Sequence, residues 1–511
     1  MTKKFNLFRP LICFLLGATS TFSLEPYAIY PLIFCFSIGV YIVLQSEKRI
    51  HTFFNGWSFS FGWFFFGLYW IGSAFFVKSA VFHFLMPFAI IFLPGVLSLV
   101  WAAAFLLTNE VTKINGIRYV WFVVVFPCFE FFRGYYLEFP WLMPGTFFAS
   151  NKYLLQSFSF VGSYSMNIVL IIIVIIPIVF FCFQKIQSKL TIFLIFPLIL
   201  MFFCGYKRYE NIIINHNKDY VITLVQPNIS QKDKWKTSLI SSHYKVLQDL
   251  TNKKNDLGSY NFRLIVWPET AFVGVYPRDK EQLLNIKKFF LNDNSNDYLF
   301  TGVINLKEKD YYNSAILINS KNKVQNVYNK NFLVPFGEYI PLKKMLPKFN
   351  FLSSKIDFKS GSKNQNFSIT NNFNFLPLIC YEIIFHKYIL EELNDKIRLI
   401  INITNDAWFG DTIGPYQHLQ FAKIRSVEFG IPVVRVANTG ISGFFDPYGN
   451  MISEIKLNKR GVVSNNVMPK LESTLFKLWG NKIFILMLIY VLLLFTYIYS
   501  MRCTGCETRE A

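Results

Sequence analysis

The distribution of apolar residues along the chain constrains its fold more than any other feature. Apolar side chains dominate residues 1–205, become less frequent up to about residue 480, and return in one block at 482–500. The mean hydropathy of +0.34 over 511 residues is too high for an ordinary soluble protein of this size. The pattern predicts a membrane domain at 1–205, a globular domain, and a C-terminal transmembrane helix.

The apolar runs in the first part predict membrane-spanning helices, because most of them approach the ~20 residues that a helix needs to cross a bilayer. Seven spans are expected there, at 11–24, 27–45, 57–77, 84–107, 119–133, 161–183 and 190–205, and an eighth at 482–500. The first run also fits a cleaved signal peptide, since Lys3, Lys4 and Arg9 precede it and small residues close it. Another apolar run follows at once, which favours a retained span.

Basic residues in the loops predict the orientation of these spans. If the N-terminus is cytoplasmic, the inside loops carry Lys48, Arg49, Lys113 and Lys185, as the positive-inside rule expects, and the alternate loops are poorer in basic residues. Seven crossings then place the globular region outside the cytoplasm, in an oxidising compartment. The eighth crossing returns residues 501–511 to the cytoplasm as a tail.

The formal net charge of +20 does not predict a nucleic-acid partner. The lysines are scattered among asparagines and isoleucines and form no stripe. We interpret the charge as compositional bias with some attraction to a membrane surface. No metal or cofactor is expected either, because the six histidines are dispersed and the Cys503-x-x-Cys506 pair lacks the second pair of a zinc site.

Residues 219–468 alternate between short β-branched runs and helical stretches, which predicts an α/β domain with largely buried strands. The expected strands are 221–225, 264–266, 298–303, 315–318, 375–379, 399–403 and 433–436. Reactive residue types follow such strands: Glu269 after Trp267-Pro268, Lys330 after Tyr328-Asn329, and Cys380 after Leu378-Ile379. The ends of strands hold side chains rigidly, so these segments are candidates for catalysis.

Each of these residues has an ordinary reading when it is taken alone. Glu269 fits a solvated or capping carboxylate, Lys330 a surface lysine, and Cys380 an inert buried cysteine. Cys380 is, however, the one cysteine in the globular region, so it has no partner there for a structural disulfide. A single thiol in an oxidising compartment therefore favours a chemical role.

Together the three segments resemble the carbon-nitrogen hydrolase, or nitrilase, superfamily, whose catalytic glutamate, lysine and cysteine occur in this order. Further blocks at 402–410, 417–418, 425–428 and 435–443 resemble the apolipoprotein N-acyltransferase branch, and the resemblance extends over the membrane spans. It implies an α-β-β-α sandwich that faces the periplasm, carried by a multi-pass protein of the bacterial inner membrane.

The resemblance implies a role for each matching residue. Cys380 would be the nucleophile, Glu269 the general base, and Lys330 the cation that stabilises the oxyanion together with a backbone N–H near Tyr381. An unperturbed thiol with a pKa near ~8.5 is mostly protonated at neutral pH, so it needs such partners.

Four further residues are candidates for support or substrate binding. Glu338 and Glu382 would keep Lys330 charged and in place, with ordinary ion pairing as an equal alternative. Tyr381 would shape the pocket beside the nucleophile. Trp235, in the polar segment Gln231–Trp235, would line the acyl or headgroup pocket or serve as an interface anchor.

The implied reaction moves an acyl chain from a phospholipid donor to the α-amine of a diacylated apolipoprotein, through a Cys380 thioester and with ping-pong kinetics; a monomer is expected. One alternative is a membrane-anchored amidase or nitrilase with water as acceptor. A cysteine-histidine hydrolase using His386 or His418 is less favoured. A transporter or receptor fits the spans but not the motifs.

Two further segments carry expectations of their own. The stretch 341–356 is unusually apolar for a loop and is interpreted as a membrane-dipping arm, with a core segment as the alternative. Glu130 and Arg133 lie one helical turn apart and are expected to form a structural ion pair at a helix end, with direct substrate contact as the alternative.

Overall fold

The computed structural model describes residues 8–77, 86–112, 115–182, 187–210, 217–253, 260–279, 281–282, 296–321, 323–335, 337–339, 357–363, 365–370 and 373–507. The chain forms two compact units. The first comprises Met1–Ile212 and Ser473–Ala511, and the second Ile213–Glu472. The apolar stretch 341–356, expected to form a membrane-dipping arm, lies outside the described residues.

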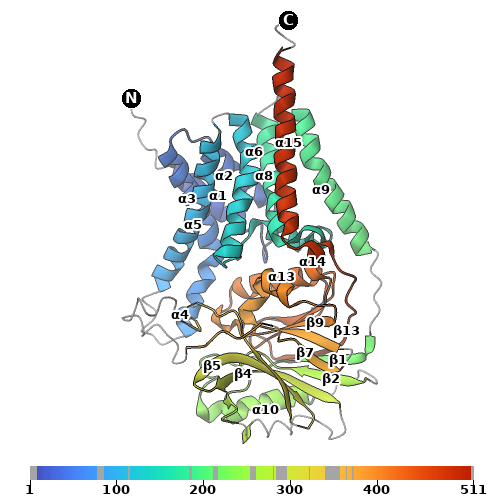
Figure 1. Ribbon diagram of the computed structural model, residues 1–511. Helices are drawn as coiled ribbons and strands as arrows, with labels where there is room; N and C mark the ends of the chain where they lie inside the picture. The colour runs from blue at the N-terminus through green and yellow to red at the C-terminus, as the bar shows by residue number, and fades with distance from the viewer. Residues whose placement is uncertain are drawn as a thin grey trace. The chain divides into compact units, whose positions relative to one another are not determined.

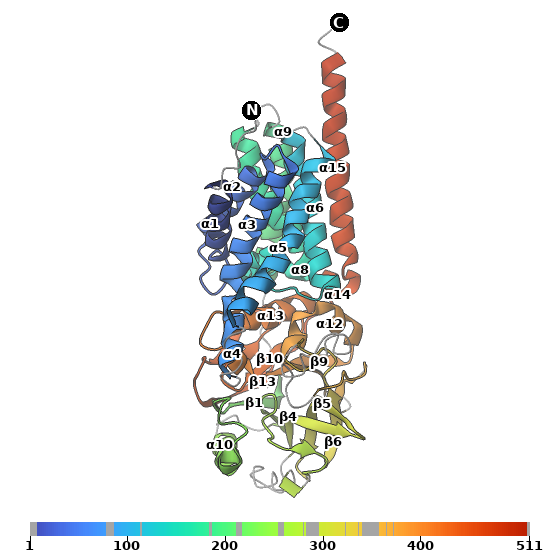
Figure 2. The same ribbon diagram turned by 90° about the vertical axis from the view of Figure 1, so that its left-hand side faces the viewer.

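Long apolar helices build the first unit (Figure 2). They are α1 (Phe8–Thr21), α2 (Ile33–Leu44), α3 (Arg49–Leu68), α5 (Met86–Val111), α6 (Asn115–Phe131), α8 (Phe158–Cys182), α9 (Gln187–Glu210) and α15 (Lys482–Glu507). Within the described residues, Arg49–Phe76, Met86–Val111 and Phe158–Phe181 are long and apolar enough to cross a membrane, and Phe8–Thr21, Tyr30–Leu44 and Lys482–Leu494 form shorter apolar helices. Each run predicted to be a span overlaps one of these helices, whereas the number of crossings stays a prediction.

Glycines allow α1 and α3 to pack at short range. A Cβ atom on Gly17 would lie 1.9 Å from the Phe59 carbonyl oxygen, and one on Gly62 would lie 2.0 Å from the Phe14 carbonyl oxygen. Small residues at such crossings are the usual way in which apolar helices gain contact when the surroundings are equally apolar. Buried aromatic rings, among them Trp63 and Trp101, fill the centre of the unit.

The expected pair between Glu130 and Arg133 is present, and both side chains are fully buried. Arg133 Nε and Nη2 donate to the two oxygens of Glu130 at 2.7 and 2.8 Å, and Trp101 Nε1 donates to Oε1 at 2.5 Å. The remaining Arg133 nitrogen donates to the carbonyls of Phe139 and Trp141. Arg133 thus ties the helix end to the chain that follows, which is a structural role.

Two sheets form the second unit. The first has the order β13-β1-β2-β4-β5-β6 with β3 paired to β4, and the second the order β12-β11-β10-β9-β8-β7. The strands of the first are β1 (Asn217–Gln226), β2 (Phe262–Val266), β3 (Val275–Tyr276), β4 (Asp297–Lys307), β5 (Asp310–Asn319), β6 (Val324–Asn329) and β13 (Gly461–Val467). Those of the second are β7 (Phe367–Thr370), β8 (Phe373–Ile379), β9 (Ile397–Thr404), β10 (Val433–Ala437), β11 (Ser442–Phe445) and β12 (Met451–Ile455).

The sheets face each other across one apolar core and carry helices on their outer faces (Figure 1). Leu264 and Phe300 of the first sheet and Phe375 and Ile401 of the second lie in that core. On the outer face of the first sheet, α10 (Ile240–Thr251) packs through Leu247. Helix α13 (Gly414–Phe429) packs against β10 and β11. These layers give the α-β-β-α sandwich expected from the sequence.

All seven strands expected from the sequence are present, with extended ends. The additional strands β3, β6, β7, β11, β12 and β13 were not expected, because they are short or carry polar residues. For example, β6 reads Val-Gln-Asn-Val-Tyr-Asn at the edge of its sheet. Edge strands need less apolar sequence than central ones, since one side remains open to solvent.

Candidate active site

Cys380 lies directly after β8, at the first position of a short 3-10 helix (Cys380–Ile384). Its φ of 53° is in the left-handed region, which a residue with a Cβ atom rarely adopts. Its relative exposure is 9%. Such backbone strain persists only where surrounding contacts enforce it, and it often marks functional sites.

A buried network enforces the conformation of Cys380 through its carbonyl group. Asn402 Nδ2 donates to the Cys380 carbonyl oxygen at 3.2 Å, and His418 Nε2 lies 3.2 Å from the same oxygen. Behind them, His418 Nδ1 lies 3.0 Å from Asp406 Oδ1, and Arg435 Nη2 donates to Asp406 Oδ2 at 2.6 Å. His418 therefore faces the main chain of the cysteine through its Nε2 atom.

Glu269 is held by a tight turn after β2. Thr270 has a φ of 48°, and the Gly302 N–H in β4 donates to the Pro268 carbonyl. A Cβ atom on Gly302 would lie 2.3 Å from Thr270 N and 2.7 Å from Glu269 Cα. Only glycine at this position of β4 lets the turn approach so closely.

Lys330, Glu338 and Asn313 form a polar cluster around Glu269. Lys330 Nζ lies 3.0 and 2.9 Å from the two Glu338 oxygens, and its side chain is 1% exposed. Asn313 in β5 donates from Nδ2 to Glu269 Oε1 at 2.7 Å and to Glu338 Oε1 at 2.6 Å. One amide thus bridges two carboxylates that would otherwise repel each other.

The Cys380 thiol interacts electrostatically with both Glu269 and Lys330, so the structure brings the three residues into one site. Burial, followed by the Glu269 charge, raises the pKa of the Cys380 thiol to about 12, although Lys330 and a hydrogen bond to Thr404 oppose the shift. Burial also raises the pKa of Glu269 above its ordinary value. For Lys330, burial alone would lower the pKa, but Glu338 and the other acidic neighbours outweigh it and raise the pKa. The resting site therefore holds a neutral thiol beside a charged ammonium.

The Glu382 carboxylate forms its hydrogen bonds with groups other than Lys330. It accepts hydrogen bonds from the backbone N–H groups of Ile379 at 2.7 Å and Asn331 at 2.7 Å, and from the Tyr328 hydroxyl at 2.9 Å. Burial raises the pKa of Glu382 to about 7 despite these donors. Glu382 thus joins the turn of Cys380 to the segment of Lys330, while Glu338 is the direct partner of Lys330.

The two aromatic candidates occupy different surroundings. Tyr381 packs against the core, and its ring centroid lies 4.9 Å from that of Phe385 in an edge-on arrangement. Trp235 is 46% exposed, in the segment after β1. The adjacent Lys234 is buried, and its Nζ donates to the Glu269 carbonyl at 3.1 Å and to Thr270 Oγ1 at 2.6 Å.

Sequence reasoning gave no role to several residues that contact the candidate triad, among them Asn313, Lys234 and Asn402, or to Asp406 and Arg435, which lie behind the residues that hold the Cys380 carbonyl. Asn313 carried a weak signal, since it is polar within the otherwise buried run of β5. Lys234 lies within a motif that drew attention only for its tryptophan. The other three lie in blocks that the family resemblance covered without a stated function.

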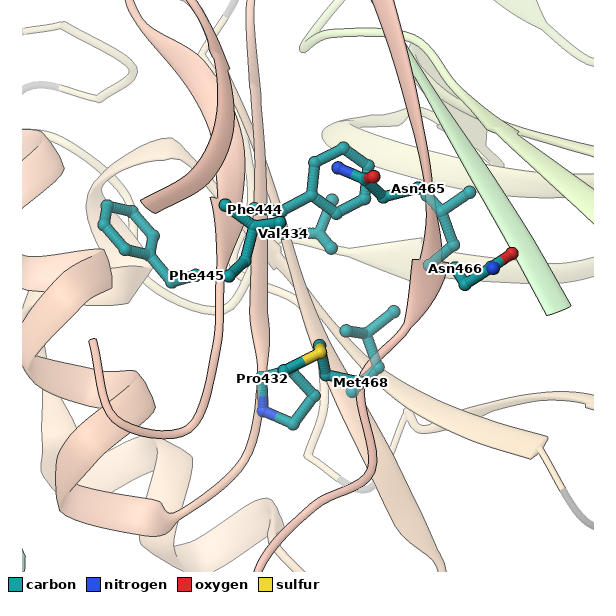
Figure 3. A pocket seen from close by; sticks show the side chains of 10 residues that line it. Pro432, Val434, Phe444, Phe445, Asn465, Asn466 and Met468 are labelled. Atoms are coloured by element: carbon teal, nitrogen blue, oxygen red, sulfur yellow. The ribbon is translucent and has the colours of Figure 1, made fainter. Parts of the chain in front are cut away.

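A separate cavity of about 20 Å³ lies between the sheets, lined mainly by apolar side chains such as Val434, Phe444 and Met468 (Figure 3). None of the candidate site residues lines it. Its volume is enough for about one water molecule, so we interpret it as a packing feature of the core.

Comparisons with known proteins cover both units. Residues 221–473 match the carbon-nitrogen hydrolase model, and residues 16–176 match the model of the apolipoprotein N-acyltransferase N-terminal domain. The chain is similar to the apolipoprotein N-acyltransferase of Rickettsia typhi, with 33% identity over 500 residues that cover 95% of this chain and 97% of the relative. The chain belongs to the apolipoprotein N-acyltransferase family.

A second relative, the apolipoprotein N-acyltransferase of Rhodopseudomonas palustris, is 31% identical to this chain. The match covers 93% of this chain and 92% of the relative. Among solved structures, the chain is similar to Nit3 of Saccharomyces cerevisiae, a member of branch 10 of the nitrilase superfamily. The two sequences are 16% identical, and the match covers 51% of this chain and 93% of that chain with a TM-score of 0.37.

Membership of the apolipoprotein N-acyltransferase family confirms the resemblance inferred from the motifs. The expected fold class is confirmed as well, as a helical membrane part combined with a carbon-nitrogen hydrolase domain. The roles of individual site residues and the compartment that the domain faces remain predictions.

Proposed function

We propose that this chain transfers an acyl chain from a phospholipid to the N-terminal α-amine of diacylglyceryl-cysteine in apolipoproteins, the last step of lipoprotein maturation. The full-length similarity to enzymes named apolipoprotein N-acyltransferase carries this proposal. The chain is an acyltransferase of a membrane family, and lipid and lipoprotein substrates follow from that family. Apolar helices in the same chain suit substrates that are themselves lipids.

In the first half-reaction, Cys380 Sγ attacks the ester carbonyl of the phospholipid while Glu269 accepts the thiol proton. The negative charge moves to the carbonyl oxygen, where Lys330 and a backbone N–H near Tyr381 stabilise it. The C–O bond then breaks, Glu269 returns the proton to the departing alkoxide, and a lysophospholipid leaves. Cys380 carries the acyl chain as a thioester. A neutral resting thiol beside a buried carboxylate supports this order of events.

In the second half-reaction, the α-amine of the apolipoprotein attacks the thioester carbonyl. Glu269 accepts a proton from the amine nitrogen and passes it to the departing sulfur, so that an amide forms and the Cys380 thiol is restored. Glu338 keeps Lys330 charged and in place throughout both steps. Tyr381 and Trp235 would line the route of the substrates. Both half-reactions share one thioester, so ping-pong kinetics are expected.

The membrane arrangement forms part of the same proposal. We place seven spans in residues 1–205, a domain at 219–468 in the periplasm, a transmembrane helix at 482–500 and a cytoplasmic tail at 501–511. The protein would lie in the bacterial inner membrane and act as a monomer. Helix α15, which continues to Glu507, supports a span that leads into the tail.

A product analysis tests the proposed function against the amidase or nitrilase alternative, which uses the same residues with water as acceptor. The protein in detergent is incubated with a phospholipid and a synthetic diacylglyceryl-cysteine peptide, and the products are identified by mass spectrometry. The proposal predicts an N-acyl peptide and one lysophospholipid for each peptide acylated. Free fatty acid with an unmodified peptide would overturn it in favour of a hydrolase.

A further inference from the structure

Lys234 is a buried ammonium whose hydrogen bonds go to the Glu269–Thr270 turn. Its relative exposure is 3%, and its Nζ donates to the carbonyl oxygen of Glu269 and to the hydroxyl of Thr270. Among the described residues it forms no ion pair. A buried charge of this kind is costly unless the protein compensates for it nearby, so its retention next to the candidate base calls for a reason.

The surroundings of Lys234 hold it in place from two sides. Asn405 Nδ2 donates to Gln231 Oε1 at 2.7 Å, which ties the segment of Lys234 to the end of β9. On the other side, His243 of α10 hydrogen-bonds to the Lys234 backbone. The charged or titratable groups that interact with the Lys234 ammonium are therefore the side chains of Glu269 and His243.

Counting charges indicates what the ammonium contributes. With a neutral thiol, Glu269 and Glu338 supply two negative charges, and Lys330 supplies one positive charge. Lys234 adds the second positive charge and makes this group of four neutral, with Glu382 outside the count below neutral pH because its pKa of about 7 keeps it largely protonated there. When the thiol proton moves to Glu269, the negative charge moves to the oxyanion, and the sum remains zero. Without Lys234, both the resting and the reacting arrangements would carry an uncompensated negative charge away from water.

We propose that Lys234 is a positioning residue for the general base: its ammonium holds the Glu269–Thr270 turn and keeps the Glu269 carboxylate negatively charged. The inference rests on the proposed function only in taking Glu269 as the base that receives the Cys380 proton. Two cations, Lys330 and Lys234, and a bond from Asn313 favour the charged form of Glu269, while burial and the Glu338 carboxylate oppose it. Lys330 makes the larger contribution but is also paired with Glu338, and Lys234 adds a second cation on the backbone side of Glu269.

The test follows alkylation of Cys380 by iodoacetamide as a function of pH, which needs no lipid or lipoprotein. The sulfur–carbon bond forms, iodide leaves, and the thiol proton passes to Glu269, so the rate reports the charge on the base. Mass spectrometry of the Cys380 peptide gives the rate, and Cys380→Ala defines the background. Lys234→Met should raise the midpoint of the acid limb by more than about 0.3 pH units, because a cation that favours the charged form of Glu269 is lost.

Two control variants separate charge from shape. Thr270→Val removes one hydrogen bond of Lys234 but keeps its charge, and should leave the midpoint within about 0.3 pH units of wild type. Lys236→Met removes a charge two residues away that pairs with Asp233 on the surface, with side chains 58% and 40% exposed, and should also leave it unchanged. Lys234→Gln replaces Lys234→Met if the latter does not fold, because it retains an N–H donor.

An unchanged midpoint in the neutral variants, with only a uniformly slower rate, would overturn the inference in favour of a purely structural lysine. An equal shift in Thr270→Val would also overturn it. Because alkylation does not depend on the acyl donor or acceptor, either result is independent of whether the transferase reaction is observed.

Discussion

Both carboxylate oxygens of Glu338 lie within 3.0 Å of the Lys330 ammonium nitrogen. The pair is largely buried, with side chains 12% and 1% exposed, and the two residues are eight positions apart. Glu338 also accepts the backbone N–H of Val334 at 2.8 Å, which fixes the turn between them. Lys330 therefore remains charged inside the protein because a dedicated carboxylate accompanies it.

Glu338→Gln should destabilise the fold by roughly 3 kcal/mol, because it leaves the Lys330 ammonium buried without its counter-charge. The measurement is thermal unfolding in detergent. Glu391→Gln is the matched control, since it breaks an ion pair with Lys363 whose side chains are 36% and 62% exposed and should cost less than about 1 kcal/mol. Equal stability of Glu338→Gln and wild type would contradict the role given to this pair.

Asn313→Asp should slow acyl-enzyme formation by roughly 10- to 100-fold. The substitution keeps the shape of the side chain but places a third carboxylate against Glu269 and Glu338, which favours the protonated, inactive form of the base. Asn319→Asp at the other end of β5 serves as control, because its side-chain oxygen accepts backbone N–H groups that a carboxylate also accepts. Single-turnover kinetics would refute the prediction if Asn313→Asp formed the acyl-enzyme at the wild-type rate.

Glu382 should make stability depend on pH near neutrality. Its pKa in the folded protein is about 7, above the ordinary value of 4.5, so the folded state binds the proton more tightly than the unfolded state does. This contribution to stability is fully present below pH 4.5 and is lost as the pH rises through 7. Unfolding followed from pH 5 to 8 should show a decline that is weaker in Glu382→Gln. If stability declined with pH equally in the wild type and in Glu382→Gln, the prediction would be wrong.

His418→Gln should leave thioester formation detectable. The Nε2 atom of His418 faces the Cys380 carbonyl oxygen, so the side chain supports the strained backbone. We expect the rate of thioester formation to fall by less than about 100-fold, which is the low end of the rate loss caused by removing a general base. His386→Ala should have a smaller effect. Complete loss of the acyl-enzyme in a folded His418→Gln variant would instead favour a cysteine-histidine hydrolase.

The sequence predicted the parts of this molecule that local pattern controls. Apolar runs gave the helices, β-branched runs gave the central strands, and Glu269, Lys330 and Cys380 each follow a strand within a few residues. Contacts between distant segments were not predictable in this way. Asn313 reaches Glu269 across 44 positions and His418 reaches Cys380 across 38, and such pairs form only when the strands of one sheet and the helix packed on it are assembled.

The hydrogen-bond partners of Glu382 were likewise not predictable from the sequence. Its place two residues after Cys380 suggested a partner for Lys330, but its carboxylate is satisfied by backbone N–H groups of its own turn and of Asn331 and Phe332. Residue type and sequence distance drew attention to a carboxylate that the structure places between the turn of Cys380 and the segment of Lys330. They could not determine which donors it would meet.

The central claim is that Cys380 carries the acyl chain, and the intact mass of the protein after incubation with a phospholipid tests it most directly. We expect an increment equal to one acyl chain in the wild type, none in Cys380→Ala, and discharge of the increment by a diacylated lipopeptide but not by water alone. An increment of the same size that persists in Cys380→Ala would contradict the claim.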